Sequence, residues 1–474
     1  MNFLIKHKLG QSRGVVQQIV SFGAGEGLSR GLNWGLMALL PFFLSTTEEY
    51  GKIGLLVSIE MLVSNISLLG LDRAVLRFYA KDEEPGRLLR CVLVIWAALA
   101  WIPLAAVLVL YFSGRETFFG IPLAPHLFLL SVIVVIFNLN FLCVCIGRAK
   151  HHLGVFLRFR LCYGVLKFVG VLLMAKLLGH SLSYVLGMGV AVLVMLIFII
   201  PFLRRRVGAQ ADRAVVGQLL IFGWPFVFHV LSGNILSYFS RFFLEAYTST
   251  KDVGIFTFAF TLGGALYVGY AALGTYFEPR IYSHADDKSR CEKWLALYTN
   301  ACITFASAAG ASLLFVYPYL TPHLNVDYGS ALPTISMVMG TILLTPLYLQ
   351  GNYRLTAHKK TGYIAAASFL SACLSIALNY LLVPSHGIWG AAMAMYVSNF
   401  LLCGIILVVS IRTARISLHQ LYSMPVYCLC SFGSLCVLLW ANDSALAILA
   451  LLMVCLVSSG LLFRVFLTRG GRTA

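Results

Sequence analysis

Ionisable side chains that interrupt long apolar stretches are the residues of this sequence whose chemistry most needs an explanation. They are Glu26, Arg30, Glu60, Lys167, His229, Arg241 and Glu245. A charge in hydrocarbon costs roughly 2.5 to 3.5 kcal/mol on insertion scales, so each group needs an opposite charge or a water-filled passage. A cation facing such a passage would bind phosphate or an acidic sugar, whereas a carboxylate would pair with a cation or carry a proton.

Lys167 is the strongest single candidate for an anion contact. It lies midway along an apolar stretch, and no acidic residue stands three or four positions to either side. A helix therefore offers it no local partner. The alternative is a lysine paired with a carboxylate of another stretch, where Glu60 is the obvious partner. Glu60 could equally carry a coupling proton.

The first apolar stretch holds a charged pair at helical spacing. Glu26 and Arg30 are four residues apart, so a helix places them on one face, where they can form an ion pair. Small residues let helices approach closely, and glycines recur here at Gly23, Gly27, Gly31 and Gly35. We expect the helix to pack through these glycines and to turn Arg30 toward a central passage. A plain ion pair is the alternative.

Arg241 and Glu245 repeat the four-residue spacing near the outer end of a later stretch. We group Arg241 with Arg30 and Lys167 as cations of the passage, although a gate or a plain ion pair with Glu245 explains the spacing better than cargo binding does. His229 titrates near neutrality in its ordinary state, and we assign it a supporting or coupling role, with a hydrogen-bonded core histidine as the alternative.

Arg158 and Arg160 stand at the inner end of the stretch that contains Lys167. Basic groups at a membrane surface attract phosphate and anionic lipid headgroups. We expect them to draw a diphosphate toward the membrane from the cytoplasmic side. The alternative is that they only fix the orientation of the helix.

The composition requires a membrane to surround these residues. Hydrophobic residues make up 60% of the chain, charged residues 11%, and the mean hydropathy is +0.87, whereas about a quarter of the residues of a soluble domain are charged. The net charge of +17 is spread over short loops and forms no basic binding face, which excludes nucleic acid as a partner.

Apolar segments long enough to cross a bilayer recur along the whole chain, so we predict an all-α integral membrane protein with about 14 transmembrane helices. Their predicted ranges are 15–44, 52–71, 91–113, 126–147, 155–178, 182–203, 217–246, 253–277, 295–317, 332–351, 362–383, 388–411, 425–441 and 445–467. Lys and Arg gather in alternate loops, which places those loops and both termini in the cytoplasm.

The short loops leave no room for a soluble catalytic domain. The sequence has no phosphate-binding GxxxxGK[ST] loop, and its 12 cysteines lack the spacing of a metal site or a redox pair. We therefore expect no enzyme activity, no cofactor and no metal.

An internal repeat relates the two halves of the chain. A shift of 203 residues places Gly51 on Gly254 and Arg77 on Arg280. A repeat of an even number of crossings keeps its orientation, so it predicts two pseudo-symmetric six-helix lobes with a binding site between them. The predicted parts are an N-terminal lobe over 1–213, a C-terminal lobe over 214–415, and an added helix pair with a cytoplasmic tail over 416–474.

Two runs of residues resemble a known family. They are Leu44-Ser-Thr-Thr-Glu-Glu-Tyr50-Gly51 and Leu69-Gly-Leu-Asp72-Arg73-Ala-Val-Leu-Arg77-Phe-Tyr79. The chain resembles, over nearly its whole length, the polysaccharide transport family of bacterial lipid-linked oligosaccharide flippases, in the multidrug/oligosaccharidyl-lipid/polysaccharide exporter superfamily. It departs from the family pattern at Ser240, where Asp is common.

The resemblance implies an alternating-access flippase of the bacterial inner membrane. Its cargo would be an undecaprenyl-diphosphate-linked oligosaccharide that moves from the cytoplasmic to the periplasmic leaflet. The implied partners are this polyprenyl-diphosphate-linked glycan, membrane lipids, a coupling proton or sodium ion, and other membrane proteins of polysaccharide assembly. The alternatives are an ion-coupled exporter of organic cations with the same fold and, further off, a membrane glycosyltransferase or polysaccharide polymerase.

Overall fold

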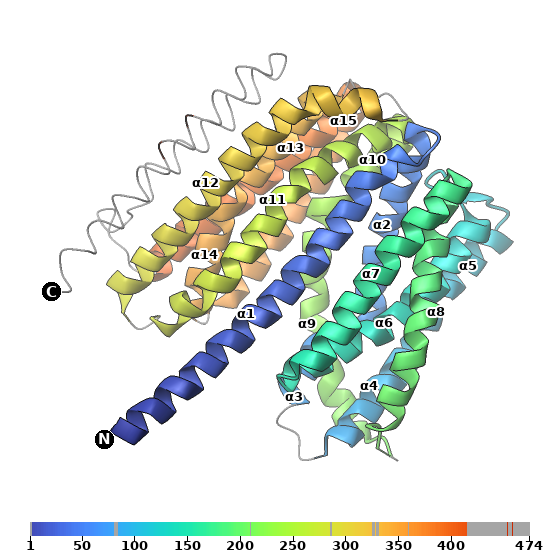
Figure 1. Ribbon diagram of the computed structural model, residues 1–474. Helices are drawn as coiled ribbons and strands as arrows, with labels where there is room; N and C mark the ends of the chain where they lie inside the picture. Colours follow the sequence, from blue (N-terminus) through green and yellow to red (C-terminus); the bar gives the residue numbers. More distant parts are fainter. Residues whose placement is uncertain are drawn as a thin grey trace. The chain divides into compact units, whose positions relative to one another are not determined.

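The computed structural model describes residues 2–79, 84–208, 210–284, 287–324, 328, 331–358, 360–414, 453 and 457. Its described residues are almost entirely helical (Figure 1). Contacts divide the chain into two compact units, unit 1 up to Asn234 and unit 2 from Ile235 onward. Each unit is described by itself.

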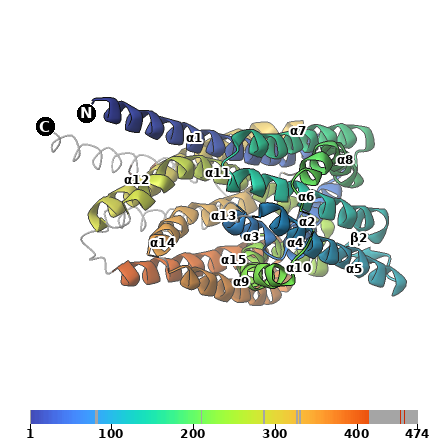
Figure 2. The same ribbon diagram turned by 90° about the horizontal axis from the view of Figure 1, so that it is seen from below.

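The described part of unit 1 contains nine α-helices, the last of which, α9, continues into unit 2. The helices are α1 (Asn2–Leu39), α2 (Thr47–Leu68), α3 (Leu71–Phe78), α4 (Pro85–Leu99), α5 (Trp101–Phe112), α6 (Phe128–Ala149), α7 (Leu153–Leu178), α8 (Leu182–Arg204) and α9 (Arg213–Tyr238). Short elements are η1 (Leu40–Phe42), the hairpin β1 (Thr117–Phe118) and β2 (Ile121–Pro122), and η2 (Leu123–Leu127). Helix α7 packs against α1, α6 and α8, and Figure 2 shows these four on one side of the unit.

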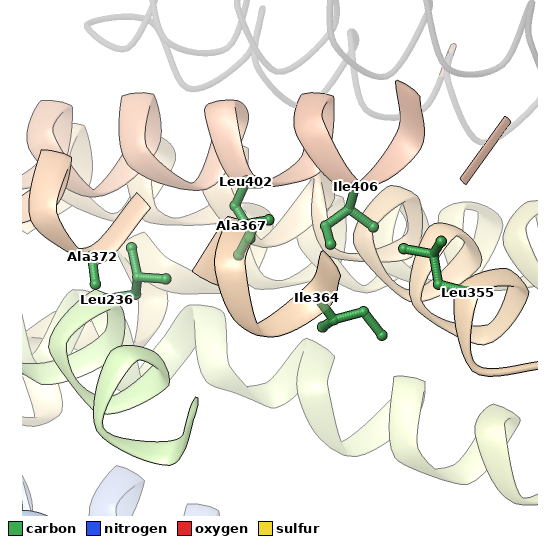
Figure 3. Packing of buried hydrophobic residues seen from close by; sticks show 7 residues of the cluster. All are labelled: Leu236, Leu355, Ile364, Ala367, Ala372, Leu402 and Ile406. Atoms are coloured by element: carbon green, nitrogen blue, oxygen red, sulfur yellow. The ribbon is translucent and has the colours of Figure 1, made fainter. Parts of the chain in front are cut away.

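Unit 2 is built from α10 (Ser240–Tyr247), α11 (Thr250–Ser283), α12 (Lys288–Leu320), η3 (Thr321–His323), α13 (Leu332–Leu343), α14 (Thr345–Ala357) and α15 (Thr361–Ala414). Helix α11 packs against α12 and α13, and α15 packs against α10, α13 and α14. Figure 3 shows part of the core, where side chains from α9, α14 and α15 meet. The cluster consists of Leu236, Leu355, Ile364, Ala367, Ala372, Leu402 and Ile406.

Ten helical segments of the described chain are long and apolar enough to cross a membrane. Helix α15 is one of them, but it kinks at Gly387 into two helices, which correspond to the predicted spans 362–383 and 388–411. The helix is interrupted at Leu344, which lies between α13 and α14 and two residues before Pro346. The all-α, multi-pass prediction is confirmed. The spans 425–441 and 445–467 lie outside the described residues, and the total of 14 stays a prediction.

Matching helix caps mark the internal repeat. Thr46 caps α2 by accepting a hydrogen bond from the amide of Glu49 at 3.2 Å, and Ser249 caps α11 in the same way with the amide of Asp252 at 3.2 Å. The two caps are 203 residues apart in the sequence, the shift that the sequence alignment predicts. A side-chain oxygen at this position satisfies an amide that has no partner within its helix. Both units therefore start a long helix with the same local signal.

Gly70 explains the turn between α2 and α3. It adopts a left-handed conformation with φ of +74°, and a Cβ on it would lie 2.4 Å from the carbonyl oxygen of Gly223 on α9. A Cβ on Gly223 would in turn lie 2.4 Å from the carbonyl oxygen of Leu69. Only glycine combines this backbone with so close an approach. Gly70, which belongs to the run Leu69–Tyr79 that resembles the family, thus allows α3 and α9 to approach closely.

We predict that Gly70→Ala lowers the free energy of unfolding by about 2 kcal/mol or more, because it adds backbone strain to a steric overlap with Gly223. Gly114→Ala is the matched control: its φ is +78°, and a Cβ there meets no atom within 4 Å. The control should lose only the strain, about 1 kcal/mol. Unfolding midpoints in mixed detergent micelles would measure both, and equal losses would contradict the close approach.

Candidate functional site

Three helices of unit 1 supply a buried ionic triad. Lys167 on α7 lies 3.2 Å from Glu60 Oε1 on α2 and 2.9 Å from the hydroxyl of Tyr184 on α8. The Tyr184 hydroxyl donates to Glu60 Oε2 at 2.5 Å. The Lys167 side chain is 8% exposed and that of Glu60 is 2% exposed. Every member contacts the other two, so the charges cancel within a closed network.

The triad overturns one expectation. Lys167 has a full carboxylate partner on another helix, so the prediction of an uncompensated cation at this position is wrong, and the alternative, pairing with Glu60, is confirmed. The partner of Lys167 comes from another helix, since Glu60 stands on α2. Helix α7 also packs against α8, which carries Tyr184. Beside the pair, one turn earlier on α7, the buried hydroxyl of Tyr163 finds no hydrogen-bond partner among the described residues.

A second charged cluster joins α1 to α7. Glu26 accepts hydrogen bonds from Arg160 Nε at 3.1 Å and Arg160 Nη2 at 2.9 Å, and it also pairs with Arg30 at 3.2 Å. Two guanidinium groups thus share one carboxylate, which leaves one positive charge in excess. The Arg30 side chain is 53% exposed. The excess charge therefore lies on the open side of α1, where Asn33 is also exposed.

Arg160 was expected to be a cytoplasmic cation that attracts headgroups, but the structure pairs it with Glu26 instead. Its reach across to α1 explains the difference, since the two residues are 134 positions apart in the sequence. Arg158 is exposed, as that expectation requires. Its role in attracting a ligand stays a prediction.

The glycines of α1 do not all act as predicted. A Cβ on Gly27 or Gly31 would meet no atom within 4 Å, whereas a Cβ on Gly25 would lie 2.5 Å from Leu157 on α7. Close packing against α7 therefore runs through Gly25, and the helix turns part of its glycine stripe outward together with Arg30. The expectation of packing through the stripe is wrong at Gly27 and Gly31.

Arg241 of unit 2 is buried in an aromatic cage. Its guanidinium carbon lies 4.9 Å from the ring centre of Phe260 and 5.3 Å from that of Tyr238, and its Nε donates to Thr257 at 3.0 Å. Glu245 accepts a hydrogen bond from the hydroxyl of Thr250 at 2.9 Å. These contacts place Arg241 in the interior of the unit and favour a positioning role over ligand contact.

His229 lies half-buried on α9 in unit 1. Its Nδ1 is buried and forms no hydrogen bond with a described residue. Among the described residues, no hydrogen bond joins His229 to the triad or to the Glu26 cluster. The supporting role assigned to it stays a prediction.

A buried ion pair in unit 2 was not predicted from the sequence. Arg354 on α14 donates from Nε and Nη2 to the two oxygens of Glu292 on α12, both at 2.7 Å, and from Nη1 to Ser410 on α15 at 2.9 Å. Arg354 is 1% exposed. This forked geometry suits a guanidinium and a carboxylate closely. The pair holds three helices together at the ends that the loop charges assign to the cytoplasm.

Two further features lie at the α3 end of unit 1. Asp72 is 3.4 Å from Arg73, and burial raises the pKa of the Asp72 carboxyl while Arg73 opposes the rise. Beside it, a cavity of about 780 Å³ opens between α3 and α9. Its wall is mainly apolar, with Arg213 and Gln218 as its polar members; the other lining residues are Phe78, Ala214, Gly217, Ile221, Phe222 and Phe226.

We predict that the Glu60 and Lys167 substitutions are strongly coupled. Glu60→Leu or Lys167→Met alone leaves one buried charge unpaired and should cost about 3 to 5 kcal/mol of unfolding free energy. The double variant removes both charges and should cost less than either single variant. The free energies of unfolding of the three variants, measured in mixed detergent micelles, complete a double-mutant cycle. Losses that add up in the double variant would show that Glu60 and Lys167 do not interact.

Arg354→Lys should cost about 2 kcal/mol, because a lysine cannot keep the two parallel bonds to Glu292. Arg290→Lys is the control, since Arg290 pairs with Asp287 at 3.2 Å but is 71% exposed. An exposed pair contributes little, so the control should change stability by less than about 0.5 kcal/mol. A loss at Arg354 no larger than that at Arg290 would contradict the role of the buried fork.

Comparison with solved structures places the fold among membrane transporters. A lipid II flippase, MurJ, in an inward closed conformation superposes with a TM-score of 0.68 at 15% identity, covering 94% of this chain and 99% of that one. An inward-facing multidrug resistance MATE family transporter of the MOP superfamily gives a TM-score of 0.60 at 14% identity, covering 80% and 93% of the two chains. A MATE structure in complex with MaD3S gives 0.55 at 16% identity, covering 83% and 95%.

Among curated proteins, none matches the sequence significantly. The family described as "Polysaccharide biosynthesis protein" matches residues 15–283. This range covers more than half of the chain and includes α2 with its cap, the Gly70 turn and the Glu60, Lys167 and Tyr184 triad. The chain is a multi-pass membrane protein with the helical fold of these transporters, and it belongs to the polysaccharide biosynthesis protein family.

Proposed function

We propose that this protein is a flippase that moves an undecaprenyl-diphosphate-linked oligosaccharide from the cytoplasmic to the periplasmic leaflet of a bacterial inner membrane. The observation that carries the proposal is the match in fold to a lipid II flippase over 94% of this chain and 99% of that one, in a chain of a polysaccharide biosynthesis family. Both termini are placed in the cytoplasm by the distribution of loop charges.

The transport step follows the two-part build of the chain. Matching helix caps 203 residues apart support two lobes that are halves of one repeat, and transporters of this build expose a central site to each side of the membrane in turn. The boundaries proposed for the lobes are 1–213 and 214–415, followed by an added helix pair over 416–474. A proton or sodium gradient would supply the driving force.

Arg30 is the group that we assign to the diphosphate. It is half-exposed, and its carboxylate partner, Glu26, is shared with Arg160. An approaching phosphate oxygen therefore meets a guanidinium whose charge is only partly neutralised. Charge-assisted hydrogen bonds of this kind are the strong ones in proteins. Lys167 contributes by holding α2, α7 and α8 in register beneath this surface.

Glu60 is the candidate for the coupling step. Its carboxylate is held by an ammonium and a phenol, so protonation would release Lys167 and break the contact between α2 and α7. A group whose charge state decides whether two helices are joined is suited to link an ion gradient to a change in helix packing.

The apolar cavity beside α9 suits the lipid portion of the cargo. Its aromatic and aliphatic wall would hold part of a prenyl chain, with Arg213 at its polar edge. The remainder of the tail would stay in the bilayer.

An exporter of organic cations is the second candidate, because MATE transporters share the fold with a TM-score of 0.60. A cationic cargo requires acidic groups in its path. Glu26 is neutralised by two arginines and Glu60 by a lysine, so the charges of unit 1 favour an anionic cargo.

We predict that Arg30→Ala lowers the rate of flipping roughly tenfold or more, the effect of losing one hydrogen bond to a charged group. The measurement is the amount of lipid-linked glycan left on the cytoplasmic leaflet of a deletion strain after the gene is returned. Lys176→Ala is the control, because Lys176 is an exposed lysine on α7 remote from α1's charged cluster.

Full rescue by Arg30→Ala would remove Arg30 from the site but leave the flippase assignment intact. Absence of glycan accumulation in the deletion strain would overturn the assignment itself. Accumulation of an organic cation in its place would favour the exporter.

A further inference from the structure

A small basic pocket lies at the end of unit 1 where the Lys-rich and Arg-rich loops gather. It has a volume of about 230 Å³, and its polar lining residues are Tyr79, Lys150, His152 and Arg206. They come from three separate loops: the end of α3, the α6–α7 turn and the end of α8. The lining contains no Asp or Glu among the described residues. The pocket is separate from the Glu26 cluster and from the ionic triad.

The cations of this pocket are held in place by rings and not by carboxylates. Lys150 Nζ lies 5.4 Å from the ring centre of Tyr79, and the guanidinium carbon of Arg206 lies 3.9 Å from that of Phe202. Arg206 also donates to the carbonyl oxygen of Phe202 at 3.1 Å. Within the described chain, neither cation forms an ion pair. Cation–π contacts orient a charge without neutralising it.

Tyr79 adds a hydroxyl to the pocket. The residue is 4% exposed, and it lines the pocket together with Lys150 and Arg206. Burial raises the pKa of Tyr79, so the group remains a protonated donor at neutral pH. The pocket therefore offers a neutral hydroxyl donor beside its two cations.

The backbone of the α6–α7 turn is tightly fixed around this pocket. A Cβ on Gly147 would lie 2.8 Å from the amide nitrogen of Phe156, so α6 and α7 touch through their backbones here. The amide of His152 donates to the carbonyl oxygen of Gly147 at 2.9 Å. Helix α7 begins at Leu153 without a side-chain cap, and Val155 in its first turn lines the pocket. The positive end of a 26-residue helix therefore adds to the field of the side chains.

We propose that this pocket binds a phosphate group, supplied by the headgroup of an anionic membrane lipid. Two cations, a phenol and a histidine provide donors to several oxygens at once, as phosphate recognition requires. A volume of about 230 Å³ admits a phosphodiester with a small substituent and excludes a long glycan. Lys150, His152 and Arg206 each lie within two residues of the end of a helix that is long and apolar enough to cross a membrane, and Tyr79 ends the short helix α3. Basic groups at such helix ends attract anionic lipid headgroups.

The consequence is a lipid that stabilises unit 1 at one membrane surface. A bound headgroup would join the C-terminal ends of α3, α6 and α8 and would offset the repulsion between Lys150 and Arg206. This function is independent of the cargo site at Arg30.

The test compares lipid retention by purified full-length protein. Protein in nanodiscs of phosphatidylglycerol and phosphatidylcholine is released into the gas phase, and retained lipids are counted by native mass spectrometry. We expect Lys150→Gln with Arg206→Gln to lower retained phosphatidylglycerol at least roughly tenfold, since each basic residue near the surface contributes about a fivefold gain in affinity. Arg205→Gln is the control, because Arg205 is exposed next to Arg206 but does not line the pocket.

A second arm distinguishes the source of the phosphate. The shift of the unfolding midpoint with inorganic phosphate, against sodium chloride of equal ionic strength, is measured in neutral detergent. A shift that the double variant abolishes, without any change in retained lipid, assigns the pocket to a soluble phosphate ester. Equal lipid retention and equal phosphate shifts in the double variant and the Arg205 control overturn the site. If the double variant is not recovered folded, Lys150→Gln alone must show a partial loss in one arm, and no loss overturns the site.

Discussion

Hydrocarbon solvates neither the ammonium group of Lys167 nor the guanidinium group of Arg354, and each unit meets this constraint with a carboxylate from a neighbouring helix. The partners are 107 residues apart in unit 1 and 62 apart in unit 2. A buried charge left alone is costly, so both members of a pair must reach the same depth in the membrane. The ion pairs therefore set the register of α2 with α7 and of α12 with α14.

This constraint also decides where charge remains available. Lys167 and Arg354 are neutralised inside their units, so they add little to the field outside. Arg30, which shares its carboxylate, and Lys150 and Arg206, which contact aromatic rings, are among the cations of unit 1 whose charge is not cancelled by a carboxylate of their own. The two proposed anion sites therefore use exposed cations and leave out the buried Lys167 and Arg354.

Sequence patterns captured what is local. Apolar length predicted the helices, and the 203-residue shift of the sequence repeat also relates the caps of α2 and α11. Ion pairs between helices far apart in the sequence were harder to predict, because residue spacing shows only the neighbours on the same helix. Glu60 was named as an alternative partner of Lys167, since both lie inside apolar segments. The partners Arg160 and Glu26 gave no such sign, because Arg160 stands near the end of its helix.

The environment of Arg354 was predicted wrongly for a different reason. The polar run around Gln350 and Asn352 lowered the local hydropathy, so the predicted span ended at residue 351 and Arg354 was placed in a loop. In the structure α14 continues to Ala357, and Arg354 is enclosed by α12 and α15. The backbone of the two units repeats more closely than their chemistry. The position in unit 2 that the 203-residue shift matches to Glu60 is Gly263, where a Cβ would lie 2.9 Å from Ile342 on α13. Unit 1 uses this position for charge and unit 2 uses it for close packing. The Glu60–Lys167 contact therefore has no counterpart at the matching position of unit 2, and the proposed coupling between Glu60 protonation and helix packing must begin in unit 1.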